Sequence, residues 1–315
     1  MYIGLNTNTW MMNPQQFTST LMTMDITTPI NATAPVKPEQ LHRRGLAKLY
    51  ATFEDQHGRT HITDRYYEAP LRISRAFRLP GSDGELCVYT SDVSPGVMNG
   101  DAYESVWQIR ENAHVVLTST SATRLHPTPT LPSSVSHTFQ LEKGAVLEYF
   151  PECVIPFAGS NATLSATFHL QESSVLVYAD VWSAGRVHRG EIYDFIRFEG
   201  NTEVWRDQEL VIWDRFALEP DQSVPDTLSS MMDYTHLASL WMVGTSIGTE
   251  ELHQIRSLLP KDTRILAGAS FLAGGEGIAV RMLGRAAFEL QEFCLTLWNS
   301  IREQTLHKPP LQFRK

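Results

Sequence analysis

The chain has 315 residues, of which 42% are hydrophobic, and its formal net charge is -9. This length can bury a sizeable core in one large domain or in two smaller ones. The negative charge excludes a broad electrostatic footprint for nucleic acid. No apolar run approaches the roughly 18 residues that a membrane span needs, and the N-terminus lacks a signal-peptide pattern. We therefore expect a cytoplasmic protein that binds neither nucleic acid nor membrane.

The three cysteines, Cys87, Cys153 and Cys294, lie far apart and form no CxxC motif. Their odd number and spacing indicate neither a zinc site nor a disulfide framework. Reduced thiols are the expected state in the cytoplasm.

Residues 1–40 differ from the rest of the chain in composition. They are rich in Thr, Asn, Met and Pro, and the first basic residue is Lys37. No hydrophobic period emerges there, so we expect a disordered or loosely attached extension. Residues 41–315 are then expected to form a single domain.

Short runs rich in Val, Thr, Phe and Tyr follow one another from residue 46 onward, at a spacing of roughly ten residues. The predicted strands cover residues 46–53, 60–65, 85–90, 104–110, 114–120, 134–142, 145–150, 164–170, 175–182, 191–198, 202–213, 263–272 and 277–283. Because no helices lie between most of them, a doubly wound sheet is excluded. A sandwich, a barrel or a β-solenoid is favoured.

The pattern changes in the C-terminal third, where two or three helices are predicted. Residues 249–259 and 285–304 each place apolar side chains on one helical stripe. A third stretch after Pro225 has apolar residues at helical spacing, namely Leu228, Met231, Met232, Leu240 and Trp241.

The usual catalytic signatures are missing from the sequence. It contains no GxxxxGK[ST], HExxH or GxSxG motif, and no GxGxxG that follows a strand. The eleven histidines are scattered, so no tight metal site is predicted. The chain is therefore not expected to be an enzyme.

Three carboxylates stand out by their neighbours. Glu148 lies in a very apolar stretch, Asp101 follows a glycine in a turn, and Glu191 follows another glycine. An unpaired charge in an apolar setting is costly, so each needs an explanation. Asp101 could cap its own turn, and Glu148 and Glu191 could pair with an arginine such as Arg124 or Arg186. Alternatively, all three could serve a weak, transient cation site.

Several motifs occur in a fixed order: a Gly-rich turn at residues 96–101, a Thr-rich strand at 117–124, and the apolar segment 147–157. Gly185-Arg186 and Gly190-Glu191 follow. Together they resemble the urease accessory protein UreD family, called UreH in some organisms, over roughly residues 43–290. The motif residues are Gly96, Gly100, Asp101, Arg124, Glu148, Pro151, Pro156, Gly185, Arg186 and Glu191.

Two departures from the family pattern affect these motifs. Ser94-Pro95-Gly96 stands where the family usually has paired glycines, and Cys153 stands where it often has Asp or Pro. A thiolate at Cys153 could add a nickel ligand, or the thiol could be buried and inert.

The resemblance implies a mainly β, β-helical or solenoid-like scaffold without enzymatic activity. Such a protein is required for urease maturation. It binds UreF, which recruits the GTPase UreG, and the assembly, a dimer of a heteromeric complex, docks on apo-urease. The implied cofactor is transient Ni²⁺ that passes through the protein to the urease active site, with no tightly bound group.

From this resemblance we predict that Asp101, Glu148 and Glu191 line or border a polar passage through the β-structure. We also expect the C-terminal helices to face UreF, because Trp241, Met242 and Trp298 are larger than a small sheet needs to cover itself.

Two alternatives remain open. A β-structured hydrolase would use paired carboxylates, Glu148 and Glu152, held about 5–10 Å apart in a groove lined by Trp107, Trp182 and Trp205. A plain carbohydrate- or protein-binding β-module would instead have no polar path through its interior.

Overall fold

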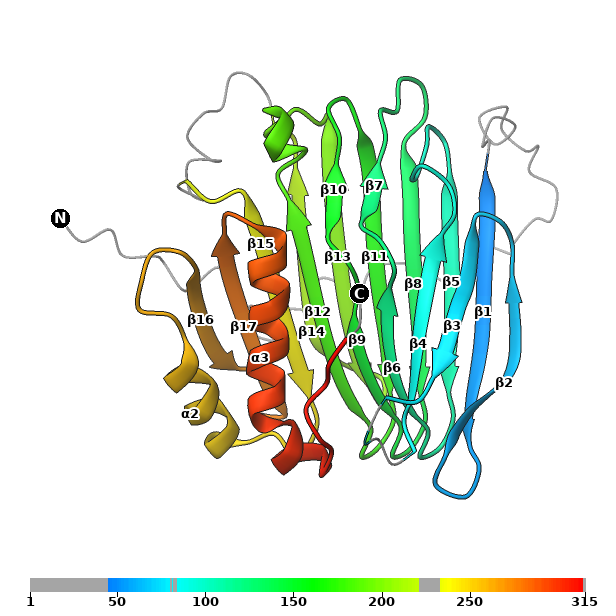
Figure 1. Cartoon of the computed structure of the whole chain (residues 1–315), viewed down its shortest axis with the longest axis vertical. Coiled ribbons are helices and arrows are strands. Elements are labelled where there is room, and N and C mark those ends of the chain that lie inside the picture. Colours follow the sequence, from blue (N-terminus) through cyan, green and yellow to red (C-terminus); the bar gives the residue numbers. More distant parts are fainter. Residues whose placement is uncertain (1–44, 80, 82–83, 221–232, 314–315) are drawn as a thin grey trace, which may run out of the picture. The chain divides into compact units, whose positions relative to one another are not determined.

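A computed structural model of the chain describes residues 45–313, except residues 80, 82–83 and 221–232. The extension predicted for residues 1–40 lies outside this range. The described chain is mainly β and forms two sheets, which we call sheet A and sheet B (Figure 1). Sheet A has seven strands, in the spatial order β14 (Glu209–Leu218), β13 (Arg197–Arg206), β11 (Asn161–Leu170), β8 (Ser133–Leu141), β5 (Ala102–Ile109), β1 (Leu46–Asp55) and β2 (Thr60–Tyr67).

Sheet B has ten strands. Its main path is β16 (Leu266–Phe271), β17 (Gly277–Gly284), β15 (His236–Val243), β12 (Val175–Ser183), β9 (Val146–Phe150), β6 (His114–Ser119), β4 (Leu86–Asp92) and β3 (Leu71–Phe77). The short strands β7 (Thr123–Leu125) and β10 (Val154–Pro156) pair with each other beside this path.

Successive strands alternate between the two sheets, and this alternation makes the fold solenoid-like. Strands β5, β8, β11 and β13 lie in parallel in sheet A, and β6, β9 and β12 lie in parallel in sheet B. The predicted turn at Lys143-Gly144 therefore connects strands of opposite sheets rather than forming a hairpin. Gly144 has φ +67°, and the equivalent corner one coil earlier places Asn112 at φ +58°. Both residue types tolerate this left-handed backbone. The predicted solenoid-like, mainly β fold is confirmed.

The core between the sheets is built from side chains that repeat in register. On the sheet A side, Phe53, Trp107, Phe139 and Phe168 stack along the coils, with the Phe139 and Phe168 ring centroids 4.7 Å apart. On the sheet B side, Tyr149, Tyr178 and Trp241 form a second stack. Because parallel coils place equivalent positions side by side, large aromatic rings at these positions pack offset and parallel.

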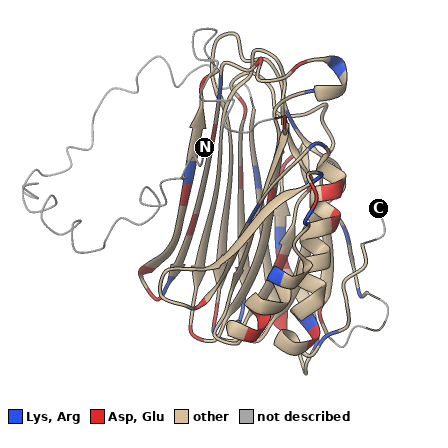
Figure 2. Ribbon diagram, turned by 90° about the vertical axis from the view of Figure 1, so that its left-hand side faces the viewer, with Lys and Arg blue, Asp and Glu red and all other residues tan. Residues whose placement is uncertain are grey.

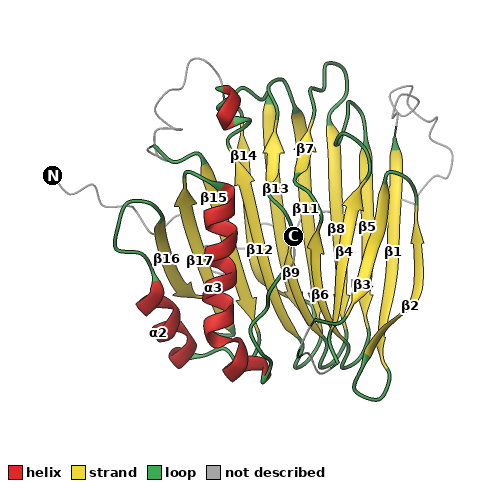
Figure 3. Cartoon of the chain, in the orientation of Figure 1, coloured by secondary structure: helices red, strands yellow, loops and turns green. Residues whose placement is uncertain are grey.

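Two α-helices pack on the outer face of sheet B, over β12, β15, β17 and β16, as Figure 3 shows. They are α2 (Thr249–Leu258) and α3 (Ala287–Leu306), and a short 3₁₀ helix, η4 (Val187–Arg189), follows β12. Both predicted helices at 249–259 and 285–304 are confirmed. No helix of the described residues is long and apolar enough to cross a membrane. In the side view of Figure 2, charges of both signs are spread over strands and helices rather than gathered into a basic face.

The helix predicted after Pro225 is wrong where the structure describes it. Leu240 and Trp241 lie in β15, and residues 228, 231 and 232 lie outside the described residues. Strand β15 is apolar on both sides because it is sandwiched between the inter-sheet core and the helices. A short run that is apolar on every side cannot be distinguished from a helix by its period.

Two predicted strands also need correction. Residues 191–196 form a loop, and β13 begins only at Arg197. The run 202–213 is interrupted by the turn at Asp207 and Gln208, which separates β13 from β14. Turn residues there are Asp and Gln rather than Gly, which hid the break.

Candidate functional site

The sequence motifs converge on one end of the coils, where strands of sheet B lead back into sheet A (the upper end in Figure 1). We call the connecting segments 93–101, 126–132, 157–160 and 184–196 the corner loops. Backbone hydrogen bonds join each to the next: His126 N donates to Val97 O at 2.9 Å, and Thr128 N donates to Gly159 O at 3.0 Å. Gly159 N donates to Asp194 O at 2.9 Å in the same way. The motif residues Gly96, Gly100, Asp101, Gly185, Arg186 and Glu191 thus lie in loops at the same end of the coils.

Two motif glycines are required by the close approach of these loops. Gly96 has φ +143°, and a Cβ placed on it would lie 2.5 Å from Arg124 O. Gly185 has φ +142°, and its Cβ would lie 2.5 Å from Glu191 O. A side chain at Gly96 would push neighbouring coils apart, and a side chain at Gly185 would force its own loop open.

Asp101 caps its own turn, as one alternative predicted. Its Oδ2 accepts hydrogen bonds from Met98 N at 2.8 Å and from the Tyr103 hydroxyl at 3.2 Å. The side chain is buried, and a Cβ on Gly45 would lie only 2.5 Å from Oδ1. Asp101 is therefore held rigidly at the start of β5.

Glu191 forms an ion pair with Arg186 in the last corner loop, which confirms the predicted pairing. Arg186 Nε donates to Glu191 Oε2 at 2.7 Å, and Nη2 donates to Oε1. Ala158 N donates to Oε2 at 3.3 Å. The hydrogen bonds from Arg186 lower the pKa of Glu191. The Arg186 guanidinium also lies 4.2 Å from the centre of the Phe157 ring, so the pair fixes two adjacent loops.

Glu148 lies elsewhere, on the face of β9 that points toward α3, and its side chain is fully buried. Arg302 contacts both carboxylate oxygens at 2.8 Å, and His114 Nε2 lies 2.6 Å from Oε1. Burial acts to raise the pKa of Glu148, but hydrogen bonds from Arg302 and His114 lower it to about 2. The predicted partner, Arg124 or Arg186, is wrong for this residue. The partner is Arg302 on α3, which sequence reasoning missed because it lies 154 residues downstream.

The three predicted passage residues are therefore not in one place. Asp101 and Glu191 lie in different corner loops, and Glu148 lies beneath α3. Cys153 is buried, and burial raises the pKa of its thiol, as expected for an inert cysteine.

Polar groups that the sequence did not reveal lie between the sheets. Two neighbouring cavities of about 90 and 50 Å³ share the lining residues Thr123, Val135, His137, Tyr149 and Pro151. The first also reaches Asp92 and Ser105, and the second reaches Glu152, Asp180 and Asn201. Tyr103, which contacts Asp101, also lines the first cavity.

The two titratable groups at the centre of these cavities have shifted pKa values. Burial lowers the pKa of His137 to about 4, so the ring is neutral at pH 7, and Nδ1 lies 2.5 Å from Ser105 Oγ. Burial and the nearby Asp214 raise the pKa of Asp180 to about 6, although Arg281 opposes this shift. A signal was available in the sequence, because His137 alternates with the inward apolar residues Val135 and Phe139, and Asp180 interrupts the apolar strand β12.

The described residues contain no group of three or more His, Cys, Asp or Glu side chains arranged to hold a metal ion. The hydrolase alternative does not fit the structure either. Trp107 and Trp182 are buried in the core, and Glu152 accepts a hydrogen bond from Gln291 at 3.1 Å. Trp241, Met242 and Trp298, expected near a partner surface, are also buried.

Comparison with known proteins agrees with the resemblance found in the sequence. A family model described as UreD urease accessory protein matches residues 45–315. The urease accessory protein UreD of Sporosarcina pasteurii is 27% identical over 78% of this chain and 96% of its own length. That of Halalkalibacterium halodurans is 29% identical over 84% of this chain and 94% of its own. These relatives are named as accessory proteins rather than as enzymes, in agreement with the prediction. The chain belongs to the UreD urease accessory protein family.

Proposed function

We propose that this chain acts in urease maturation as a scaffold that passes Ni²⁺ to apo-urease. The observation that carries the proposal is the pair of adjacent cavities between the sheets, with His137 in the lining of both and Asp180 in the lining of the second. Neutral imidazole and carboxylate oxygen are ligands that a borderline cation such as Ni²⁺ accepts. Because these groups are spread along a path instead of clustered, they favour transient contacts over tight binding.

The protonation states of the path suit a cation at neutral pH. His137 is neutral, so one ring nitrogen keeps a free lone pair, and Asp180 is ionised above its pKa of about 6. Below pH 6 Asp180 takes up a proton and loses its attraction for a cation. Transfer through this path is therefore expected to weaken as the pH falls below 6.

Asp101, Glu148 and Glu191 keep distinct places in the proposal. Asp101 borders the first cavity through Tyr103, and Glu191 stands in a corner loop at the same end of the coils. Glu148 contributes from outside the cavities, by fixing β9 to α3.

The partners in this proposal follow from the family resemblance. UreF binds the chain, and UreG joins through UreF and supplies GTP hydrolysis, for which this chain has no phosphate-binding motif of its own. The assembly is a dimer of the heteromeric complex and works in the cytoplasm. In this proposal UreG hydrolyses GTP, and this chain only lets the nickel ion pass to urease.

Co-expression of urease subunits with the other accessory proteins, with and without this chain, tests the proposal. Omission is expected to abolish both urease activity and nickel in the purified urease. Asp101→Ala and Glu191→Ala are expected to reduce both quantities while leaving the chain folded, as measured by circular dichroism. Full activity without the chain would overturn the proposed function.

A further inference from the structure

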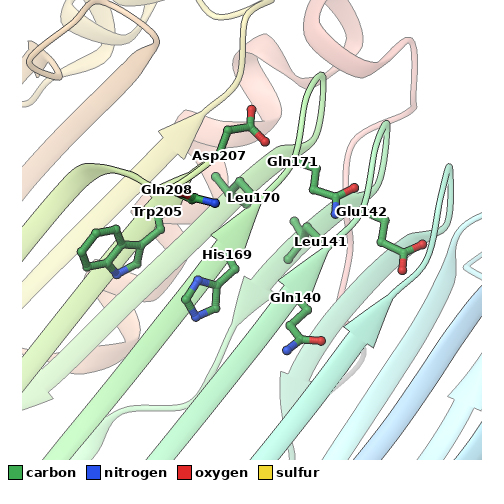
Figure 4. A pocket seen from close by; sticks show the side chains of 9 residues that line it. All are labelled: Gln140, Leu141, Glu142, His169, Leu170, Gln171, Trp205, Asp207 and Gln208. Carbon is green, nitrogen blue, oxygen red and sulfur yellow. The ribbon is translucent and has the colours of Figure 1, made fainter.

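A hollow of about 630 Å³ lies on the outer face of sheet A, at the ends of β8, β11 and β13. These strands run in parallel from the corner loops, so the hollow is at the opposite end of the coils. Gln140, His169 and Trp205 occupy neighbouring register positions on the three strands, and Figure 4 shows their side chains standing in one row. Leu141 and Leu170 are buried beneath them. The buried Leu141 and Leu170 thus form the base of the hollow, and the Trp205 ring forms one of its sides.

Local backbone features place Trp205 and Asp207 on this rim. Strand β13 stays in register with β11 through Trp205, which places Trp205 directly beside His169. The bulge at this point falls on the other neighbour, β14, where Val211 is the extra residue. The turn residues Asp207 and Gln208 have φ +45° and +75°, which bends the chain sharply after Arg206. The Trp205 indole N–H donates to Glu203 Oε2 at 3.1 Å, so the plane of its ring is held.

The charge of the lining indicates which ligand fits. The lining contains two carboxylates, Glu142 and Asp207, one histidine, His169, and no lysine or arginine. Arg110 Nη1 lies 2.6 Å from Glu142 Oε1, so that charge is already balanced. Arg206 turns away from the hollow to Glu276 and to backbone carbonyls. Among the described residues, no cation pairs with Asp207. A neutral ligand would leave this charge uncompensated, whereas a cation would balance it.

We propose that this hollow receives an arginine side chain presented by a protein partner. A guanidinium is planar and stacks on an indole ring, and its fork of N–H donors can bind Asp207 while others reach the amide oxygens of Gln140 and Gln208. A lysine ammonium would supply charge but neither the plane nor the fork. The inference concerns a surface outside the nickel path and does not depend on that path.

The test uses the purified full chain and a capped peptide of alternating glycine and arginine, without nickel or urease. Two-dimensional ¹H–¹⁵N spectra follow the Trp205 indole N–H, which is assigned by its loss in Trp205→Phe. The peptide is expected to shift this signal saturably. Asp207→Asn is expected to weaken binding about threefold to thirtyfold in this titration, the range for a charge-assisted bond. Trp205→Ala lacks the signal, so its affinity is measured by isothermal titration calorimetry beside the unchanged chain, and a loss of about threefold to thirtyfold is expected there, the range for a cation–π contact.

Two control peptides and one control variant separate the effects of the ligand's charge, the ligand's shape and the position of the tryptophan. A peptide with citrulline in place of arginine keeps the shape and loses the charge, and it is expected not to bind. A lysine peptide is expected to bind more weakly than the arginine peptide. Trp213→Ala removes an exposed tryptophan on β14 outside the hollow and is expected to change affinity less than twofold.

The proposal is overturned if the citrulline or lysine peptide binds as tightly as the arginine peptide. It is also overturned if Asp207→Asn, which removes only a surface charge, leaves the arginine affinity unchanged, or if no saturable binding is seen. Neither result would bear on urease activation, which is measured separately.

Discussion

The outer faces of the two sheets are built in opposite ways. The outer face of sheet B is covered by α2 and α3 and encloses Arg302 and Glu148, both almost fully buried. On sheet A, no described helix packs on the outer face, and its central strands present small polar side chains. These are Ser134, Ser136 and Thr138 on β8, and Thr163, Ser165 and Thr167 on β11. Parallel sheets are usually covered on both faces, so the uncovered face is the unusual one. The charges beneath α3 on sheet B form buried ion pairs, whereas no described helix shields the outer face of sheet A.

The largest expected effect comes from comparing one ion pair on each face. Glu148→Ala leaves Arg302 buried without its main partner and is expected to lower the free energy of unfolding by about 3–5 kcal/mol. Glu142→Ala breaks the exposed pair with Arg110 on sheet A and is expected to cost less than about 1 kcal/mol. Urea denaturation of both variants measures the difference. Equal costs would show that the buried pair does not fasten α3.

Lowering the pH tests the same Glu148–Arg302 ion pair in a second way. The folded-state pKa of Glu148, about 2, lies below its ordinary value of 4.5, so its contribution to stability is complete above pH 4.5. That contribution is lost as the pH falls from 4.5 toward 2. The midpoint temperature of thermal unfolding is expected to depend less steeply on pH across this range in Glu148→Gln than in the natural chain. An unchanged pH profile in this variant would argue against an ionised Glu148.

The corner loops join the two faces, and Gly96 tests how tightly they do so. Gly96→Ala combines a left-handed backbone with a contact to Arg124 O, and a loss of about 2–4 kcal/mol is expected. Gly190→Ala is the control, because Gly190 has φ +80° but no atom within 4 Å of a new Cβ. It should lower the free energy of unfolding only by the cost of a side chain on a left-handed backbone, about 1–2 kcal/mol. Equal losses would mean that the loops can separate.

Asp180→Asn tests the interior between the two sheets. Unlike the substitutions above, it is expected to stabilise the chain. The folded-state pKa of Asp180, about 6, lies above its ordinary value of 3.8, so stability falls as the pH rises from 3.8 through 6. Removing the charge is expected to stabilise the chain at pH 7.5 by up to about 3 kcal/mol, the value of a shift of about two pKa units. Chemical denaturation at pH 7.5 checks this. A destabilised variant would indicate that the carboxylate supports the fold.

The smallest effect is expected on the outer face of sheet A. Thr138→Ala and Thr167→Ala remove half-exposed hydroxyls and are expected to change stability by less than about 0.5 kcal/mol. Thermal unfolding checks both. Larger losses would mean that this face is part of the folded core rather than a surface free for partners.

The same comparison explains how far the sequence could predict the fold. Strand β11 alternates polar and apolar residues because one face is exposed, and this pattern predicted it correctly. In β15 both faces are buried, the alternation disappears, and a helix was predicted instead. The assignment of successive strands to opposite sheets could not be predicted, because turn residues such as Lys143-Gly144 also suit hairpins.

The candidate site was predicted in part, for similar reasons. The motif glycines and Asp101 act through local turns and loop contacts, so their sequence neighbours carried the signal. The partner of Glu148 is remote in sequence and was missed. His137 and Asp180 were missed because the cavity that both line forms only when strands of the two sheets pack against each other.

The most direct test of the nickel path is urease maturation with the double variant His137→Gln and Asp180→Asn, co-expressed with urease and the other accessory proteins. A folded variant that still co-purifies with its partners, but yields urease with little nickel and little activity, is the predicted result. Urease with full nickel and full activity from the same variant would contradict the proposed path between the sheets.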